Sequence, residues 1–339
     1  MKKTTNTPCD FNRRSVHGTL MAAALFGALC VTAPQAVLAQ AFPAKPVRMI
    51  VPFGPGTATD VFARQFSAGM SKDLGQSVVM EYKAGAGGVI GAVAAATSAP
   101  DGYTMLLASS ASHGSNPSLY KKLGYDPVAD FAPIARVVFY PSVLAVRKAL
   151  PVKTVADLVA YAKANPGKLN FASTGPGSQG HMQASMLASV ANIKVIHVPF
   201  KEAGQIYTAF ERGDVDFMFY TFAALQPVIQ SGAVHPIAGT GEKRIESTPS
   251  TPTMAEAGFP EVTMSAWSAL YAPAGTPARM VERLNQAALR TLGDPDMQKK
   301  LASLDIIVAP STPQELLAFT KSEVERYRKI AAMAGLQPE

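Results

Sequence analysis

The chain has 339 residues, of which 48% are hydrophobic, and its 31 lysines and arginines against 24 acidic residues leave a net charge of +7. This small excess of positive charge, without basic runs interleaved with aromatic residues, argues against a nucleic-acid partner. Both cysteines, Cys9 and Cys30, lie within the first 41 residues, so the rest of the chain holds no disulfide, thiol nucleophile or cysteine metal site.

Residues 1–41 have the features of a cleavable secretory signal peptide. Two basic pairs, Lys2-Lys3 and Arg13-Arg14, precede an apolar run at 20–32 that is too short to cross a bilayer, and small residues follow it. We expect cleavage after this segment and export to the periplasm, with the general and twin-arginine routes both open. Cleavage removes four bases and one acid, which lowers the net charge from +7 to +4.

The sequence after the signal peptide begins with an alternation of strand-like and helix-like segments. Short runs rich in β-branched and aromatic residues predict strands, and apolar residues spaced by about 3.6 positions predict helices. The predicted elements are strands at 47–53, 77–82 and 103–108 and helices at 59–74 and 88–97. This order predicts a parallel sheet with helices on both faces.

The alternation continues through the rest of the chain. The predicted strands are 142–146, 169–172, 193–198, 217–220 and 266–272, and the predicted helices are 155–164 (with Thr154 as N-cap), 181–190, 203–212, 277–292 and 312–334. No flexible linker divides two halves, so the strands near 142–146 and 266–272 are interpreted as crossings. We therefore expect two α/β domains, one formed by 42–144 with 264–339 and the other by 145–263.

Glycine-rich or small turns follow several predicted strands and precede helices. They are Phe53–Asp60, Gly85–Gly88 and Ser173–Ser178, and a further strand ends in Ser109–His113. Small residues allow backbone N–H groups to face a ligand, and the following helix presents the positive end of its dipole. Such turns favour an anion, but they do not specify which anion.

The turn Gly175–Gly180 matches the G-x-G-x-x-G spacing of a dinucleotide-binding fingerprint. That fingerprint also needs an acidic residue at the end of the next strand, where this chain has Pro199, Phe200 and Lys201, with Glu202 beyond them. A dinucleotide enzyme, or another α/β enzyme that uses this turn, is therefore kept only as the alternative. The sequence also lacks a G-x-S-x-G elbow and an H-E-x-x-H motif, so we expect no catalytic residue, no metal and no cofactor.

Several stretches considered together resemble one family. They are KPVRMIVPFGPGTATDVFAR, AGAGGVIGA, PDGYTMLLASSASHGSNPSLYKKLGYDPVADFAPIA, HVPFKEAG, GDVDFMF, TPTMAEAGFPE and APAGTP. In this order they are similar to the substrate-binding proteins of the tripartite tricarboxylate transporter family, the Bug family of periplasmic receptors. The resemblance covers nearly all of the chain after the signal peptide.

The resemblance implies a fold of the type II periplasmic binding proteins, with two α/β domains around a ligand cleft. It also implies that main-chain amides of two turns hold a ligand carboxylate, and these turns match Phe53–Asp60 and Ser173–Ser178. The candidate ligand-binding residues are Phe53, Gly54, Thr57, Ala58, Thr59, Asp60, Ser109, Ser110, His113, Ser173, Thr174, Gly177, Ser178, Lys201, Tyr220 and Phe222.

Two positions depart from the family pattern. Thr57 stands where a glycine is usual, and Tyr220 stands where the family often has an aspartate that suits a ligand ammonium group. We therefore expect a carboxylate without an amino group and consider an aromatic one a candidate, with Phe53, Tyr220 and Phe222 as apolar walls. The side chain of His113 or Lys201 would meet a second acid group of the ligand.

The resulting hypothesis is a monomeric periplasmic receptor that performs no chemistry. It would capture a small carboxylate and deliver it to the membrane subunits of a tripartite transporter. A receptor that presents the same ligand to a signalling protein is the second binding hypothesis. Genes for membrane subunits beside this one would favour transport, and a histidine kinase gene would favour sensing.

Overall fold

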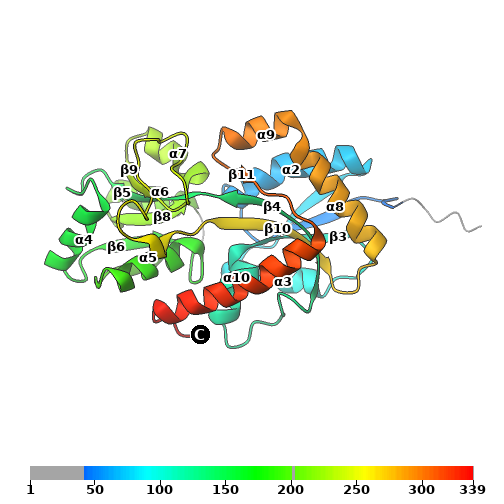
Figure 1. Ribbon diagram of the computed structural model, residues 1–339, viewed down its shortest axis with the longest axis horizontal. Coiled ribbons are helices and arrows are strands. Elements are labelled where there is room, and N and C mark those ends of the chain that lie inside the picture. Colours follow the sequence, from blue (N-terminus) through cyan, green and yellow to red (C-terminus); the bar gives the residue numbers. More distant parts are fainter. Residues whose placement is uncertain (1–41, 201–202, 339) are drawn as a thin grey trace, which may run out of the picture. The chain divides into compact units, whose positions relative to one another are not determined.

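Two β-sheets organise the residues that the computed structural model describes, which are 42–200 and 203–338 (Figure 1). The first sheet has six strands in the order β11 (Ile307–Val308), β4 (Phe131–Tyr140), β10 (Ala266–Pro273), β3 (Thr104–Ser109), β1 (Val47–Val51) and β2 (Val78–Tyr82). The second has five, in the order β7 (Ile196–Pro199), β6 (Asn170–Ser173), β8 (Phe217–Thr221), β5 (Ser142–Arg147) and β9 (Val234–Gly239).

The predicted parallel pairing of the first three strands is confirmed, but both sheets are mixed, because strands from later in the chain join them antiparallel. Strand β1 pairs in parallel with β2 and β3, but β10 runs antiparallel to both β3 and β4. In the second sheet β6 is parallel to β7 and β8, whereas β5 is antiparallel to β8 and β9. The chain enters the second sheet with β5 and returns to the first sheet with β10, and these two strands run antiparallel to their neighbours.

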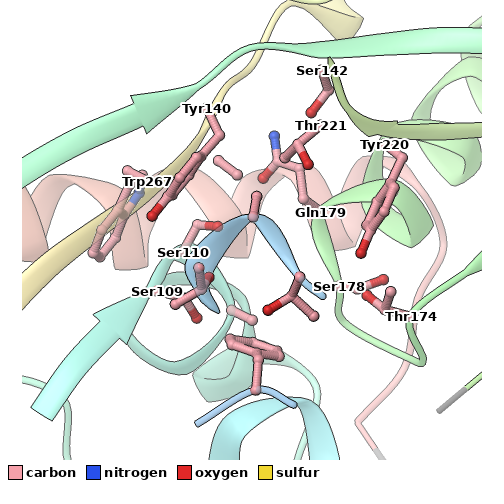
Figure 2. A pocket seen from close by; sticks show the side chains of 17 residues that line it. Ser109, Ser110, Tyr140, Ser142, Thr174, Ser178, Gln179, Tyr220, Thr221 and Trp267 are labelled. Carbon is pink, nitrogen blue, oxygen red and sulfur yellow. The ribbon is translucent and has the colours of Figure 1, made fainter. Parts of the chain in front are cut away.

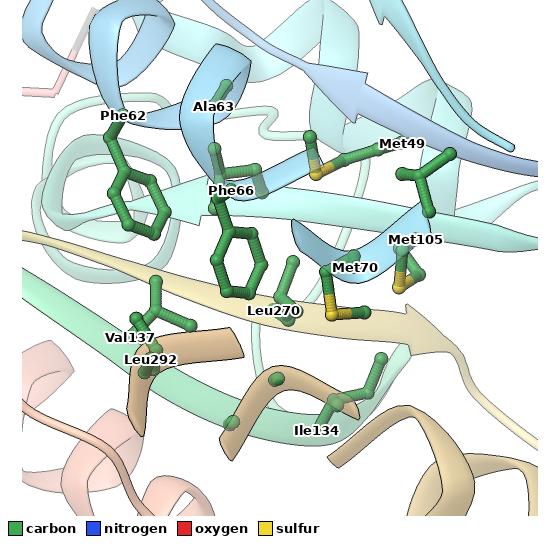
Figure 3. Packing of buried hydrophobic residues seen from close by; sticks show 14 of the residues in the cluster. Met49, Phe62, Ala63, Phe66, Met70, Met105, Ile134, Val137, Leu270 and Leu292 are labelled. Carbon is green, nitrogen blue, oxygen red and sulfur yellow. The ribbon is translucent and has the colours of Figure 1, made fainter. Parts of the chain in front are cut away.

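Successive side chains of a strand point to opposite faces of the sheet, so each face of the first sheet has its own core cluster. Met49 and Val51 of β1 pack with α2 (Ala58–Leu74), α8 (Ala278–Gly293) and α9 (Pro295–Ala302), as Figure 3 shows for part of this cluster. Ile50, between them, points to the opposite face, where α3 (Val89–Ala96) and α10 (Pro313–Met333) contribute to the core. A strand with both faces covered is mostly apolar, which explains Met49, Ile50 and Val51. Arg48, in the same strand, is half-buried and forms an ion pair with Glu81 at 3.0 Å.

The second sheet is covered in the same way. Its two faces pack against α4 (Val155–Ala164) with α5 (Gln179–Val190), and against α6 (Ala203–Arg212) with α7 (Phe222–Gln230). The predicted N-cap of α4 is confirmed, because Thr154 Oγ1 accepts a hydrogen bond from the Asp157 N–H and the Asp157 carboxylate accepts one from the Thr154 N–H. No helix in the described part of the chain is long and apolar enough to span a membrane.

The chain passes between the sheets twice. Only Pro141 separates β4 from β5, and residues 263–265 lead back into β10. The helix α10 belongs to both sides, since its Leu316 lies in a core cluster of the first sheet and its Ile330 in a cluster of the second. In Figure 1 this helix, drawn in red, runs from the first sheet toward α5.

The sequence analysis missed β4, β9, β11, α7 and α9, and proline accounts for three of these omissions. Proline in the middle of a predicted element argues against a strand or a helix. In the structure Pro236 lies in β9, which is an edge strand, and Pro133 lies in the part of β4 that β11 does not reach. Pro227 lies inside α7. In both strands the proline lies beside a register shift of the partner strand, and such irregularities tolerate proline.

Candidate functional site

A cavity of about 80 Å³ lies where the carboxyl ends of β1, β3, β6 and β8 meet (Figure 2). In α/β proteins this end of the strands is the usual place for a ligand. The cavity is lined by the turns after these strands and by strand residues that flank both crossings. The lining residues are Phe53, Thr57, Ala58, Thr59, Ser109, Ser110, Ala111, Tyr140, Ser142, Thr174, Ser178, Gln179, Gly180, Tyr220, Thr221, Ala266 and Trp267.

Four helical N-termini contribute to the cavity wall. Thr57, Ser178 and Thr221 are the N-caps of α2, α5 and α7, and the short helix η2 (Ala111–Ser115) begins after β3. The first N–H groups of a helix have no partner inside the helix, and the dipole makes this end positive. Two termini from each sheet therefore direct donors and positive potential toward the same small volume, which favours an anion.

Three side-chain donors of the wall are buried without a hydrogen-bond partner among the described residues. They are the hydroxyls of Ser142 and Thr221 and the Nε2 amide group of Gln179. Figure 2 shows them gathered in one part of the pocket. Buried polar groups are nearly always satisfied, and leaving one unpaired costs free energy. The three groups thus indicate that a ligand with acceptor atoms belongs in the cavity.

None of the lining residues carries a charge at neutral pH. Asp60, which was predicted to contribute, is buried behind the first turn of α2. Its carboxylate accepts hydrogen bonds from the Gly56 N–H at 2.9 Å, the Tyr82 hydroxyl at 2.5 Å and Arg64 at 3.0 Å. Burial raises the pKa of Asp60, but these hydrogen bonds outweigh burial and the pKa lies below its ordinary value. Asp60 therefore stays ionised and holds the turn rather than lining the cavity.

Aromatic rings form much of the apolar wall. The Tyr140 hydroxyl donates to Ser268 Oγ at 3.0 Å, and the Trp267 indole N–H donates to Glu323 Oε2 at 2.7 Å. Both rings therefore offer apolar surface, because their polar atoms are already bonded elsewhere. Burial raises the pKa of Tyr220 above its ordinary value, so its hydroxyl stays neutral beside a bound anion. In Figure 2 the Tyr220 side chain extends toward the turn after β6.

The structure brings nine of the sixteen predicted site residues together around the cavity. These nine are Phe53, Thr57, Ala58, Thr59, Ser109, Ser110, Thr174, Ser178 and Tyr220. Gly54, Asp60, His113, Ser173, Gly177 and Phe222 do not line it, and Lys201 lies outside the described residues.

His113 lies in the core of the first sheet, so it cannot meet a second acid group of a ligand in this cavity. Its ring is fully buried, with centroids 4.2 Å from Tyr271 and 4.6 Å from Phe131, and its Nδ1 atom lies 3.1 Å from the Ser112 hydroxyl. Burial lowers the pKa of His113 to about 3, so the ring is neutral. Its aromatic neighbours are far away in the sequence, which is why the pattern did not reveal this role.

Of the four other predicted residues outside the cavity wall, Ser173, Gly177 and Gly54 support the turns and Phe222 lies in the core. The Ser173 hydroxyl lies 2.6 Å from His197 Nε2 and accepts from the Gly175 N–H. The Gly177 carbonyl accepts from the Ser115 hydroxyl at 2.7 Å and so joins the turn to the side of the first sheet. Phe222 packs in the core beneath α7, as its apolar side chain requires. Gly54 accepts a hydrogen bond from the Thr57 hydroxyl through its carbonyl group.

The fingerprint spacing at Gly175–Gly180 has a purely structural explanation. Gly175 and Gly177 have φ angles of +112° and +75°, which side chains rarely adopt. At Gly180 a Cβ atom would lie 2.3 Å from the Phe219 carbonyl oxygen, so only glycine lets α5 pack this closely on β8. The spacing therefore reflects a tight turn and a close helix–strand contact.

Sequence reasoning missed eight lining residues. Four of them, Ala111, Gln179, Gly180 and Thr221, directly follow or lie beside predicted positions. The other four are Tyr140, Ser142, Ala266 and Trp267. These four flank the crossings between the sheets, and the prediction of crossings near 142–146 and 266–272 was a signal that could have placed them in a cleft. No group of three potential metal ligands occurs among the described residues.

Comparison with known proteins identifies the family and the fold of the chain. Residues 62–336 match the sequence model of the "Tripartite tricarboxylate transporter family receptor". The solved structure of R. palustris Rpa4515 with adipate has a TM-score of 0.84 and 32% sequence identity, covering 88% of this chain and 100% of that chain. The periplasmic binding protein BugD has a TM-score of 0.83 and 33% identity, with coverages of 88% and 100%. MatC (Rpa3494) from Rhodopseudomonas palustris with bound malate has a TM-score of 0.79 and 33% identity, with coverages of 85% and 99%. The chain therefore has the periplasmic-binding-protein fold.

Proposed function

This chain belongs to the tripartite tricarboxylate transporter family of receptors, and from this premise we propose that it captures a small organic carboxylate between its two sheets. The family and the fold are those of periplasmic solute-binding proteins. One observation carries the choice of a carboxylate: helical N-termini and three unpaired donors line a cavity in which no described residue carries a charge. Such a wall offers donors to an acceptor-only group and no carboxylate to an ammonium group.

The size of the cavity supports a small ligand. A cavity needs roughly 10–15 Å³ to hold one water molecule. This cavity of about 80 Å³ therefore accommodates a ligand of several non-hydrogen atoms. Adipate and malate, which the names of two solved relatives give as their ligands, belong to this class. A dinucleotide is several times larger, and this argues against the alternative that the Gly175–Gly180 turn serves an enzyme.

The chemistry near Tyr220 favours a carboxylate without an amino group. A ring and a neutral hydroxyl stand here, where an aspartate would attract an ammonium group. Phe53, Tyr140 and Trp267 extend the apolar wall, so an aromatic carboxylate is a candidate ligand as well as an aliphatic one. The ligand-binding residues in this proposal are those that line the cavity.

The delivery function follows from the family and is part of the proposal. The two sheets are the centres of two domains that close over the ligand, and the crossings at Pro141 and at 263–265 are the hinge. After removal of the signal peptide the receptor is a periplasmic monomer. Its closed form delivers the carboxylate to the membrane subunits of a tripartite transporter.

Isothermal titration calorimetry of the exported protein tests the proposal. The panel contains adipate, malate, benzoate and terephthalate, with aspartate, glutamate and NAD as comparisons. We expect binding of one or more carboxylates that lack an amino group, and none of NAD. Binding of NAD alone would overturn the receptor hypothesis. Tighter binding of aspartate or glutamate than of every other carboxylate would contradict only the inference from Tyr220.

A further inference from the structure

One side-chain donor of the cavity is oriented by a residue outside the cavity. The Tyr327 hydroxyl, on α10, donates a hydrogen bond of 2.7 Å to the Oε1 atom of Gln179, the first residue of α5. This contact occupies the acceptor end of the Gln179 amide. The donor end, Nε2, is buried without a partner among the described residues, and Gln179 lines the cavity.

The direction of this amide decides what the cavity recognises. A carboxamide group presents a donor at one end and an acceptor at the other. With Oε1 bonded to Tyr327, Gln179 presents N–H groups to the ligand, beside the unpaired hydroxyls of Ser142 and Thr221. If the amide turned over, its oxygen would face a carboxylate and repel it.

The side chain of Tyr327 is buried and closely packed. Its side chain is 1% exposed, and its ring lies so close to Gly114 that a Cβ atom there would be 2.7 Å from Tyr327 Cδ2. The side chain of Ser110 is a second hydrogen-bonding neighbour of the Tyr327 hydroxyl, and it can donate while the tyrosine donates onward to Gln179. Ser110 follows a strand of the first sheet and Gln179 follows a strand of the second. The tyrosine therefore connects two helical N-termini of the cavity from behind.

We propose that Tyr327 is a positioning residue that determines ligand specificity, because its hydroxyl fixes the Gln179 amide with the donor end toward the ligand. The residue makes the site selective for carboxylates over carboxamides and amines without touching the ligand. This inference rests on the proposed function and adds the source of its selectivity. Burial raises the pKa of Tyr327 above its ordinary value, so the hydroxyl remains a donor at all physiological pH values.

The substitution Tyr327→Phe tests the inference, because it removes the hydroxyl and keeps the ring against Gly114. The matched control is Tyr271→Phe, which affects another buried tyrosine. The Tyr271 hydroxyl lies 2.6 Å from Thr320 Oγ1 on the same helix, and Tyr271 does not line the cavity. Each substitution removes one buried hydroxyl and keeps the ring, so a general loss of stability would appear in both variants.

The first measurement is calorimetric discrimination between adipate and adipamide, and between malate and malamide. We expect Tyr327→Phe to weaken carboxylate binding by about fivefold or more and to narrow the ratio of acid to amide affinity. Tyr271→Phe should leave this ratio unchanged. A second variant, Gln179→Glu, places an acceptor where the donor was and should weaken carboxylate binding further. An unchanged ratio in Tyr327→Phe, or equal changes in both tyrosine variants, would overturn the inference.

The second measurement needs no ligand and separates this inference from the proposed function. In protein labelled with ¹⁵N at glutamine, the side-chain signals of Gln179 are assigned by their absence in Gln179→Asn. We expect Tyr327→Phe to shift or broaden these signals, and Tyr271→Phe to leave them in place. If the wild-type protein binds no carboxylate, the proposed function fails while this measurement still decides whether Tyr327 orients Gln179. Unchanged Gln179 signals in Tyr327→Phe would refute that orientation.

Discussion

The indole N–H of Trp267 donates a hydrogen bond of 2.7 Å to the Oε2 atom of Glu323. Trp267 forms part of the cavity wall and is the only tryptophan in the sequence, while Glu323 lies on α10 with 5% of its surface exposed. A carboxylate of the last helix thus supports a wall of the site. Because no other residue contributes indole fluorescence, the emission of the protein reports this one contact.

Replacing Glu323 with leucine should destabilise the protein. The indole N–H would remain buried without an acceptor, and we expect the free energy of unfolding to fall by about 1–3 kcal/mol with a change in Trp267 emission. Glu323→Gln keeps an acceptor and should cost less. Urea denaturation followed by fluorescence measures both effects.

The matched control for this prediction is Glu325→Gln on the same helix. Glu325 forms an exposed ion pair with Arg328 at 2.8 Å, and exposed ion pairs contribute little to stability. A loss in Glu323→Leu no larger than in this control would show that the buried hydrogen bond contributes little.

The substitution Thr221→Val should separate binding from stability. Thr221 caps α7 without a side-chain capping bond, and its hydroxyl is buried without a partner among the described residues. Removing this hydroxyl removes an unsatisfied polar group, so we expect the melting temperature without ligand to stay equal or rise. Carboxylate affinity should fall by about 5- to 10-fold, because one donor to the ligand is lost. Differential scanning fluorimetry and calorimetry measure the two effects.

Thr320→Val is the comparison for Thr221→Val. The Thr320 hydroxyl donates to the Leu316 carbonyl and lies 2.6 Å from the Tyr271 hydroxyl, so the same substitution there breaks existing hydrogen bonds. Its melting temperature should fall. If Thr221→Val lowered the melting temperature as much as Thr320→Val, the Thr221 hydroxyl would have a structural partner after all.

Gly180→Ala should disturb the site through the backbone. The added methyl group would lie 2.3 Å from the Phe219 carbonyl oxygen, so α5 has to move away from β8. We expect a loss of about 1–3 kcal/mol in unfolding free energy together with weaker carboxylate binding. In Gly204→Ala, within α6, nothing lies within 4 Å of the new Cβ atom, and the helix should gain up to about 1 kcal/mol. Similar unfolding curves for the two variants would exclude the proposed clash.

Stability should depend on pH through His113. Burial lowers its pKa from 6.5 to about 3 in the folded protein, whereas a nearby carboxylate, Asp126, acts in the opposite direction. The unfolded chain takes up a proton near pH 6.5 and the folded protein does not. The stabilisation is therefore complete above pH 6.5 and decreases by about 1.4 kcal/mol per pH unit as the pH falls toward 3.

Comparison of the wild-type protein with His113→Phe between pH 4 and pH 7 isolates this contribution. Phenylalanine suits a site between Tyr271 and Phe131 and cannot take up a proton. The unfolding free energy of the variant should depend less on pH than that of the wild type by the slope of one proton. Parallel pH profiles would show that His113 is not held neutral by burial.

The sequence determined the class of the protein through its resemblance to a family, and local features located the small turns that follow the strands. The resemblance to the Bug receptors is confirmed by the family match and by the solved relatives. Small residues between strands and helices predicted Phe53, Thr57, Ser110 and Ser178, which line the cavity. The sequence could place these residues near one another because a strand, a tight turn and a helix start are local, and their physical requirements appear in adjacent residues. Their role in ligand binding stays a prediction.

Only the tertiary structure decided which side chains line the cavity. His113 and Tyr140 are both aromatic residues near strand ends, but long-range packing buries the first among rings and turns the second into the cavity. The orientation of Gln179 depends on Tyr327, which lies 148 positions further along the chain. β10 runs antiparallel to β3 and β4, and this pairing places Trp267 in the cavity wall. Which strands pair is likewise decided by the tertiary structure. Contacts between distant segments leave no local pattern in the sequence. The propensity of a residue for a helix or a strand does not depend on which distant segment that residue contacts.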